Sequence, residues 1–560
     1  MIRPRLTLAA AATAAVAVTA LAAQPAGATP SHHHHGRTVP VRLLALNDFH
    51  GNLEPPTGSS GTAIDENGKS VPAGGAAYIA AHMKRLTDRN TLKVAQGDLI
   101  GASPLISAAY HDEPSVEFMG DIGLTASAVG NHEFDEGLNE LLRIQNGGCH
   151  PVDGCSPAGP WKGAKFDYLG ANVLREKTNK PAIKPWTIRR INGVRIGFIG
   201  VVTKTTPTIV TADGIKGLKF DDEVASANRS ARELRKRGVH AMVLLVHEGD
   251  QVVQGEKPND CGVVPGAGTR IATQADPDID VVLSGHTHQQ YMCTVKDPQG
   301  RPRLYSSGSS FGRIISQVDF QVDRRTDDIV RSSLKGVNHV VTRDVPPDPA
   351  TETFVQTWKD RVAPIANKKI GTITADLTRA QSPAGETTLG DVIADAQLEA
   401  VKDKGAQVAV TNPGGVRTDL VYKNDGTVTY GDAFAVQPFS NVTGVTTLTG
   451  KQLDDLLEQQ WTSAGEKILQ PSSGLRFTID RTRPVGDRVS NITIDGKAVD
   501  PAASYRIAAN NFLLGGGDGF TVLTQGKDQV LGPIDLDALV SYFGSHSPVH
   551  PPALDRISGK

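Results

Sequence analysis

Five short motifs in the first half of the chain contain side chains that bind metal ions. They are Asp48-Phe49-His50, Gly97-Asp98, Gly130-Asn131-His132-Glu133, His247-Glu248 and Gly285-His286-Thr287-His288. Imidazoles and carboxylates without a thiolate suit Zn, Mn, Co and similar divalent ions. Two carboxylates, one carboxamide and four imidazoles are too many ligands for one tetrahedral site and enough for two. The motifs therefore predict a site that holds two metal ions.

Two adjacent metal ions indicate a type of reaction. Ions about 4 Å apart can clamp the attacking and leaving oxygens of a phosphoryl displacement and can deprotonate a water molecule. One carboxylate must then bridge the two ions. Each motif alone has a common structural explanation, as a solvated loop, a turn or a hydrogen-bonded histidine, so the prediction rests on the five together.

Each motif follows an apolar run that is typical of a buried strand. The runs cover residues 41–46, 92–95, 126–129, 241–246 and 279–283, and 194–202 predicts a further strand. In open α/β sheets, sites lie beyond the carboxyl ends of the strands, because the strand holds a residue rigidly while the loop exposes it. We therefore expect the motifs to meet at one edge of an α/β fold.

A Pro-rich segment, Val345-Pro346-Pro347-Asp348-Pro349, divides the chain and precedes a helical pattern over 351–368. We place a domain boundary here, with the helix as a connector. Beyond it, apolar spacing predicts a helix over 389–400 and a buried strand over 408–410. Another helix is expected after the N-cap candidate Thr449, and its apolar face reads Leu453, Leu456, Leu457 and Trp461.

Three loops in the second half have the composition of a substrate site. They are Asn412-Pro413-Gly414-Gly415-Val416-Arg417, Gln437-Pro438-Phe439-Ser440-Asn441 and the segment 511–520. Glycines let a backbone approach an anion, and an arginine offers two parallel hydrogen bonds to phosphate. A loop aromatic can stack on a base, although such a phenylalanine more commonly closes the edge of a core.

Together these motifs resemble the calcineurin-like metallophosphoesterase family and, with the second half, the secreted 5′-nucleotidase family, which includes the periplasmic UDP-sugar hydrolases. The resemblance runs from Val41 to the mid-540s. It implies an α/β fold: a four-layer metallophosphoesterase sandwich of helices flanking two sheets over 41–345, a linker and connector helix over 346–368, and a C-terminal α/β substrate-binding domain over 369–548.

The resemblance also implies roles for the motif residues, with two divalent metal ions (Zn, Mn, Co or similar) as cofactors. The implied ligands of one ion are Asp48, His50, Asp98 and His288. Those of the other ion are Asp98, Asn131, His247 and His286, with Asp98 as the bridge.

A catalytic pair of His132 and Asp135 is implied as well. Asp135 would orient the imidazole, and His132 would stabilise charge developing at phosphorus and assist the leaving group. The spacing of three residues permits this contact if the loop enters a helical turn. We expect Glu133 and Glu248 to make local hydrogen bonds.

In the second half, the resemblance implies nucleotide contacts. Phe439 and Phe512 would sandwich the base, and Asn441 and Asp518 would contact base or ribose. Asn412 and Arg417 would lie on the phosphate and sugar side.

One position departs from the family. Relatives carry an arginine just before the glutamate that opens the first C-terminal helix, and here Gly385 precedes Glu386. Arg379, which lies upstream, is the candidate replacement. This departure leaves open the preference among mono-, di- and cyclic phosphates.

The N-terminus has the features of an export signal. Arg3 and Arg5 precede an Ala/Leu/Val-rich run over 6–23, and Ala26-Gly27-Ala28 is a small-x-small cleavage pattern. These features predict a signal peptide over 1–28, with an uncleaved membrane anchor as the less favoured alternative. A disordered tail containing four histidines is expected over 29–40. No other run reaches the ~20 apolar residues that span a bilayer, so we expect a secreted, extracellular or periplasmic protein.

Composition and cysteines agree with this assignment. The 560 residues include 58 Lys+Arg against 60 Asp+Glu, and this balance argues against a nucleic-acid polymer as partner. Export permits disulfides, and four cysteines allow three pairings. Cys149 and Cys155 enclose a short Pro/Gly loop, so we expect them to pair and to leave Cys261 with Cys293. We expect a monomer, with a dimer as the alternative.

The sequence therefore predicts a secreted two-metal phosphohydrolase that removes phosphate from extracellular nucleotides, by in-line attack of a metal-bound hydroxide. Gly385 keeps two related activities open: a 2′,3′-cyclic nucleotide phosphodiesterase/3′-nucleotidase, and a nucleotide-sugar or dinucleotide pyrophosphatase. A binding protein that scavenges nucleotide or metal without turnover is the non-enzyme alternative. A metal-dependent nuclease is less favoured, because the chain has no excess of basic residues.

Overall fold

The computed structural model describes residues 37–210, 214–253, 257–439, 441–462 and 465–559. Residues 38–560 belong to one compact unit. The signal peptide expected over 1–28 and most of the tail expected over 29–40 lie outside the described residues. Within the described ranges, no helix combines the length and the apolar character needed to cross a membrane.

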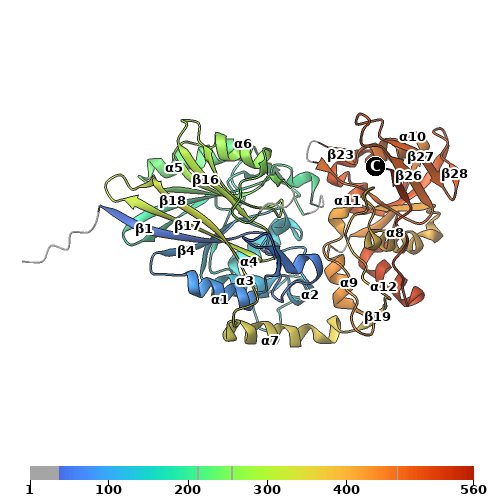
Figure 1. The fold of residues 1–560 in the computed structure, drawn as a ribbon, viewed down its shortest axis with the longest axis horizontal. Helices are drawn as coiled ribbons and strands as arrows, with labels where there is room; N and C mark the ends of the chain where they lie inside the picture. The colour runs from blue at the N-terminus through green and yellow to red at the C-terminus, as the bar shows by residue number, and fades with distance from the viewer. Residues whose placement is uncertain (1–36, 211–213, 254–256, 440, 463–464, 560) are drawn as a thin grey trace, which may run out of the picture. The chain divides into compact units, whose positions relative to one another are not determined.

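Two six-stranded sheets form the framework of the first half (Figure 1). The first has the order β18-β17-β1-β4-β5-β6, with strands Asp328–Val340, Ile314–Asp323, Thr38–Leu46, Thr91–Ala95, Leu124–Ala128 and Asp167–Leu169. The second has the order β15-β16-β14-β11-β9-β8, with strands Gln290–Lys296, Pro302–Gly308, Ile279–Ser284, Met242–His247, Val194–Val202 and Trp186–Ile191. In the first sheet, β1, β4, β5 and β6 run parallel to one another. In the second sheet, β9, β11, β14 and β16 do the same.

The parallel strands are apolar along their whole length because both of their faces are covered. Every residue of β11 and β14 is buried, as expected for strands between two layers. Side chains such as Val94, Phe198 and Leu283 form one core between the sheets.

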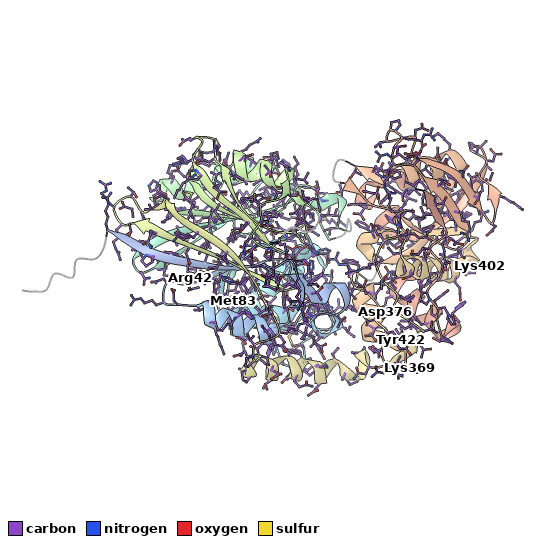
Figure 2. All side chains as sticks on the ribbon, viewed as in Figure 1. Arg42, Met83, Lys369, Asp376, Lys402 and Tyr422 are labelled. Carbon is purple, nitrogen blue, oxygen red and sulfur yellow. A yellow bond between two sulfur atoms is a disulfide. The ribbon has the colours of Figure 1, made fainter. Side chains whose placement is uncertain are left out.

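Helices cover the outer face of each sheet. On the first sheet lie α1 (Ala76–Leu86), α3 (Glu113–Asp121) and α4 (Gly137–Asn146). Their Met83, which Figure 2 labels, Phe118 and Ile144 join one buried cluster. On the second lie α5 (Glu223–Lys236) and α6 (Ala267–Gln274), which bury Leu234 and Ile271. This arrangement confirms the expected four-layer sandwich.

The connector helix α7 spans Pro349–Ala366, against the expected 351–368. Asp348 caps it by accepting a hydrogen bond from the Thr351 backbone N–H, and a proline occupies the first turn. Its Trp358 and Val362 are buried in the same cluster as α1 and α3.

The two largest sheets of the second half have five and four strands. One has the order β25-β20-β29-β22-β30, with strands Gln470–Pro471, Val408–Thr411, Ser504–Asn510, Val442–Thr449 and Lys527–Ile534. The other has the order β28-β27-β26-β31, with strands Lys497–Ala498, Val489–Ile494, Leu475–Ile479 and Ile557–Gly559. The helices of this half include α8 (Thr388–Ala400), α9 (Tyr430–Val436), α10 (Gly450–Glu458), α11 (Asn511–Leu514) and α12 (Asp535–His546).

Local sequence signals located three of these elements. The helix predicted over 389–400 is α8, the strand predicted over 408–410 is β20, and Thr449 caps α10 through a capping box with Gln452. The prediction that Trp461 lies in this helix was wrong. The helix ends at Glu458, and Trp461 is in a short hairpin, where its indole N–H donates to Glu466 at 2.6 Å.

Both expected disulfides are present, Cys149–Cys155 and Cys261–Cys293. The first closes a loop after α4, and the second ties β15 to the segment before α6.

Candidate functional site

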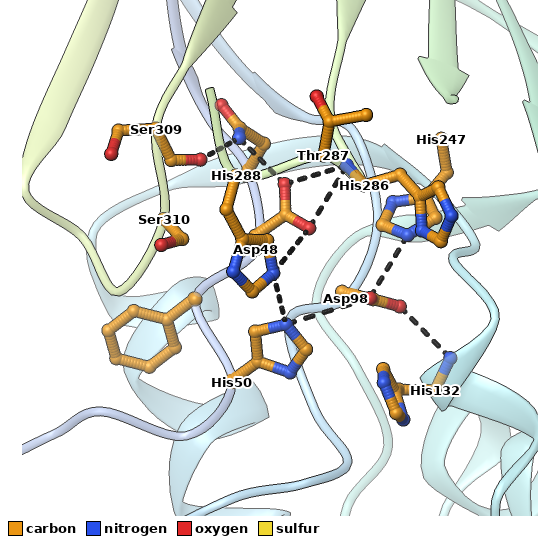
Figure 3. Close-up of polar contacts among 12 residues, drawn as sticks. Asp48, His50, Asp98, His132, His247, His286, Thr287, His288, Ser309 and Ser310 are labelled. Atoms are coloured by element: carbon orange, nitrogen blue, oxygen red, sulfur yellow. Dashed lines mark hydrogen bonds and ion pairs between the residues drawn. The ribbon is translucent and has the colours of Figure 1, made fainter. Parts of the chain in front are cut away.

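The five predicted motifs meet at the carboxyl ends of the parallel strands. Asp48 follows β1, Asp98 follows β4 and Asn131 follows β5, while His247 ends β11 and His286 follows β14. Figure 3 shows these loops bringing their side chains together. The sequence prediction of a common edge is therefore confirmed.

The ligand loops have an unusual backbone. Left-handed φ angles between 46° and 72° occur at five of the predicted ligands, Asp48, His50, Asp98, His286 and His288. This conformation is uncommon for residues other than glycine and costs about 1–3 kcal/mol each, so the surrounding fold must impose it. Gly130 allows the close approach, because a Cβ there would lie 2.1 Å from Oδ1 of Asp98. Such strain is concentrated where a protein aims side chains at a ligand.

One group of ligand atoms surrounds the Nε2 atom of His50. This nitrogen lies 3.2 Å from Nε2 of His288 and 3.6 Å from Oδ2 of Asp98. Nε2 of His288 lies 3.4 Å from Oδ1 of Asp48 (Figure 3).

A second group surrounds His247. Its Nε2 lies 3.0 Å from Oδ2 of Asp98 and 3.1 Å from Oδ1 of Asn131. His286 completes this group, in which one ligand atom each of Asp98, His247 and His286 lies within 4.8 Å of the others. Asp98 also belongs to a group with His50, and so occupies the position that a bridging carboxylate requires.

The donor set fits divalent ions. Nδ1 of His50 bonds the Gly101 carbonyl at 2.9 Å, and Nδ1 of His247 bonds the Gln96 carbonyl at 2.8 Å, which directs both Nε2 atoms into the site. Burial lowers the pKa of His50 well below its usual value, so this ring is neutral, the form that binds metals. The Nε2 atoms of His50 and His288, which lie 3.2 Å apart, can then both act as ligands of one cation.

The carboxylates are ionised. Burial raises the pKa of Asp48, but the hydrogen bond and the charge of His288 lower it by more, so that the pKa falls to about 2. The pKa of Asp98 is also lowered, since His247 and His132 outweigh the effect of burial. Both side chains therefore carry the negative charge that a pair of divalent ions would neutralise.

His132 and Asp135 form the expected pair. His132 opens a 3₁₀ turn, His132–Phe134, that brings its Nδ1 to 2.9 Å from Oδ2 of Asp135. The His132 backbone N–H donates to Oδ1 of Asp98 at 2.9 Å, which ties the pair to the predicted bridge. Burial lowers the pKa of His132, but Asp135 and Asp98 raise it more, so the ring favours its protonated form.

The two neighbouring glutamates have the local roles predicted for them. Glu133 accepts hydrogen bonds from the backbone N–H groups of Asp98, Leu99 and Gly130, and so fixes the loop that carries the bridge. Glu248 accepts one from Gly249 at 3.0 Å.

A cavity of about 410 Å³ joins this centre to the loops of the second half. From the first half it is lined by Asn131, His132, Asp135 and His286 among others. Of the predicted substrate residues, those that line it are Asn412, Arg417, Phe439, Asn441, Phe512 and Asp518. The guanidinium of Arg417 lies 5.6 Å from the centre of the Phe439 ring.

Asp518 is held in place on two sides. Its Oδ2 accepts a hydrogen bond from Nδ2 of Asn412 at 2.7 Å, and its Oδ1 pairs with Nζ of Lys467 at 2.6 Å. Asn412 is itself contacted by Asn510 at 3.3 Å. Lys467 lines the cavity and was not predicted, because no motif surrounds it in the sequence.

The chain matches two described families. Residues 41–290 match "Calcineurin-like phosphoesterase", and residues 369–525 match "5'-nucleotidase, C-terminal domain". The cell wall protein Lmo0130 of Listeria monocytogenes is 33% identical over 90% of this chain and 67% of its own length. The chain belongs to the 5′-nucleotidase family of calcineurin-like metallophosphoesterases.

A solved structure and a second relative are also similar to this chain over most of its length. The 5′-nucleotidase precursor from Thermus thermophilus superposes with a TM-score of 0.77 and 27% identity, over 93% of this chain and 99% of that one. Endonuclease YhcR of Bacillus subtilis is 33% identical over 90% of this chain, which spans 40% of the length of that relative. These matches place the chain in a family of metal-dependent phosphoester hydrolases, which normally bind two divalent metals.

Gly385 stands where the resemblance implies an arginine before α8, and the backbone at this position disfavours a side chain. Gly385 has a φ of +96°, and a Cβ at this position would lie 2.7 Å from Cγ1 of Ile468. Any side chain is therefore strained. Arg379, the candidate replacement, pairs with Asp419 at 3.4 Å and donates to Oγ of Ser60 at 3.0 Å. It is not among the residues that line the 410 Å³ cavity.

Proposed function

We propose that the protein is a 5′-nucleotidase-type phosphohydrolase of extracellular nucleotides. The observation that supports this most is the shared cavity, in which His132 and Asp135 face the loops of Phe439 and Phe512. A nucleotide has a phosphate at one end and a flat base at the other, and the cavity offers both charged and aromatic side chains to receive them. The matches to 41–290 and 369–525 support the domain boundaries that we propose, at 41–345, 346–368 and 369–548.

The second half would bind the nucleoside. Phe439 and Phe512 offer ring faces for the base, and Asn441 offers an amide for its edge. Asp518 is fixed by Asn412 and Lys467, so its carboxylate can accept hydrogen bonds from ribose hydroxyls without first having to be ordered.

Arg417 would bind the phosphate. No hydrogen bond to its guanidinium is found among the described residues, and it lines the cavity beside Phe439. Burial lowers its pKa, but arginine stays charged at any physiological pH. A phosphate could therefore take its two parallel N–H groups.

Two divalent ions held by Asp48, His50, Asp98, Asn131, His247, His286 and His288 would polarise the phosphoryl group and activate a water molecule. His132 acts at the same end of the substrate. With Nδ1 held by Asp135, its Nε2–H can donate to a phosphoryl or leaving-group oxygen, stabilising the charge that develops there. Asp135 keeps the ring in that orientation.

We also propose that the protein works outside the cytoplasm. Two disulfides fit an oxidising compartment, and the predicted signal peptide over 1–28 provides the route. A 33% identical relative bears the name cell wall protein.

Two rival activities follow from specific observations. The absence of an arginine at Gly385 favours cyclic nucleotides or diphosphate esters, because one phosphate contact of the family is missing. The relative named an endonuclease makes polymer cleavage the second rival. A nucleotide-binding protein without turnover remains the non-enzyme alternative.

A substrate panel separates these activities. We would compare kcat/KM for 5′-AMP, 2′,3′-cyclic AMP, a UDP-sugar and NAD, with ring opening followed separately because it frees no phosphate, and plasmid DNA nicking. The proposal predicts the highest value for 5′-AMP and loss of it in Arg417→Met. The matched control is Arg483→Met, since Arg483 is exposed and its side chain pairs with Asp487, outside the cavity lining. A preference for another substrate class would replace the proposal with that class.

A further inference from the structure

A second group of metal-binding side chains lies apart from the seven proposed ligands. His111 follows α2 (Leu105–Ala108), Glu136 precedes α4, and His150 and Asp153 lie on the loop closed by Cys149–Cys155. His150 and Gly154 exchange two backbone hydrogen bonds across this loop, at 2.9 and 3.0 Å. Three separate segments of the chain thus converge on one point.

The contacts at this point are close and directional. Nδ1 of His111 lies 2.8 Å from Oε2 of Glu136, and Nε2 of His111 lies 3.0 Å from Oδ2 of Asp153. Nδ1 of His150 lies 3.1 Å from the same Asp153 oxygen and also accepts a hydrogen bond from the Asp153 backbone N–H at 3.1 Å, a bond that metal binding through Nδ1 would replace. The two imidazole rings stack, with their centroids 3.8 Å apart.

This is the donor pattern of a zinc site. One ligand atom each of His111, His150 and Asp153 lies within 4.8 Å of the others. Tetrahedral zinc with bonds near 2.1 Å separates its ligand atoms by about 3.4 Å, so the observed spacings of 3.0 and 3.1 Å require only small shifts and a turn of the stacked rings. Imidazole donors favour zinc and similar transition ions over Ca²⁺ and Mg²⁺.

The outer contact of His111 completes the pattern. A histidine that binds a metal commonly donates its other ring N–H to a carboxylate, which orients the ring. Glu136 occupies that position at Nδ1, and leaves Nε2 directed at the Asp153 side. The backbone holds the ring there through a left-handed φ of 50° at His111.

We propose that His111, His150 and Asp153 bind one divalent transition-metal ion, zinc or a similar ion, with Glu136 orienting His111. A water molecule would complete the four ligands, since the side chain of Asp153 is 64% exposed and the site is open to solvent. The ion would fasten the Cys149–Cys155 loop to the turns before α3 and α4. Glu136 directly follows Asp135, so the same ion would steady the segment that carries the proposed catalytic pair.

Zinc stoichiometry tests this proposal. We would measure bound zinc by equilibrium dialysis and elemental analysis, in a full-length background with His32 to His35 replaced by alanine, because a run of histidines can itself bind metals. His111→Ala and His150→Gln should each bind one zinc ion fewer per chain than the parent. The control His546→Ala removes a histidine that contacts Glu399 and stacks on Tyr542, and should bind the parent amount.

A second measurement distinguishes loss of zinc binding from loss of folding. Asp153→Asn changes one exposed side chain, and its thermal unfolding without zinc should match the parent. Zinc should slow amide hydrogen exchange over 149–155 in the parent and not in Asp153→Asn. Equal zinc content in the parent and all three site variants, or equal exchange with and without zinc in the parent, would overturn the proposal and leave an exposed ion-pair network.

Discussion

The ring of Phe439 stacks on the ring of His132, with 5.5 Å between centroids and 18° between planes. One aromatic side chain of the second half therefore covers the imidazole proposed for proton transfer. A base cannot occupy the face of Phe439 that His132 covers. Either the base uses the other face or the two rings separate when substrate binds.

Phe439→Ala should weaken nucleotide binding selectively. Base stacking contributes about 1–3 kcal/mol, so KM for 5′-AMP should rise about tenfold or more. A small aryl phosphate has no base to stack, and its KM should stay unchanged. Steady-state kinetics on both substrates check this, and an equal loss on both would show that Phe439 serves the reaction centre rather than the base.

His132→Ala and Asp98→Asn should lose most turnover while the fold persists. Removing a positioned proton donor typically lowers kcat by about 10²–10⁴-fold, and Asp98→Asn removes the charge of the proposed bridge. Circular dichroism and thermal unfolding would confirm folding. The exposed Glu399→Gln is the control and should keep full activity. Full activity in either site variant would refute the assignment.

Asp135→Asn should reduce turnover less than His132→Ala. The amide can still contact Nδ1 of His132, but it cannot stabilise a positive ring. Activity of this variant should begin to fall at a lower pH than in the parent, because the pKa of His132 loses one of its raising contacts. An unchanged pH–rate profile would argue against the orienting role of Asp135.

Gly385→Ala should destabilise the protein rather than restore a family contact. The left-handed backbone costs about 1–2 kcal/mol for alanine, and the clash with Ile468 adds about 1–3 kcal/mol. Gly405→Ala is the matched control, since Gly405 has a φ of +81° and open space around its Cβ position. Chemical denaturation should show a larger loss at Gly385, and equal losses would mean that Ile468 can move aside.

Asp391 should make stability depend on pH. It is fully buried, and burial raises its pKa to about 9 although Arg556 lowers it and Glu386 raises it again. The folded state therefore holds a proton that the unfolded chain releases near pH 4, so this stabilising contribution is lost as pH rises towards 9. Asp391→Asn should flatten the fall in unfolding free energy between about pH 6 and 9. The same slope in both proteins would show that Asp391 is already ionised.

The convergence of the candidate metal ligands was predictable because its signals are local. Strand periodicity placed each motif at a strand end, ligand chemistry identified the side chains, and the spacing of His132 and Asp135 indicated their contact. The same holds for both disulfides and for the cap at Thr449.

What the sequence did not reveal arises from long-range packing. Lys467 pairs with Asp518, which lies 51 residues further along the chain, and the sequence around neither residue indicates this contact. The strain at Gly385 depends on Ile468, which lies far along the chain. Trp461 continues the helical spacing in the sequence, but the helix ends at Glu458. The indole N–H donates instead to Glu466 in a hairpin.

The central claim is that this cavity hydrolyses a nucleotide phosphate with the help of two metal ions. The most direct test is phosphate release from 5′-AMP by chelated protein, before and after Zn, Mn or Co is added back. We expect no phosphate release after chelation. At least one added ion should restore turnover in the parent protein but not in Asp98→Asn. Release that survives chelation, or none with any ion while the protein is folded, would contradict it.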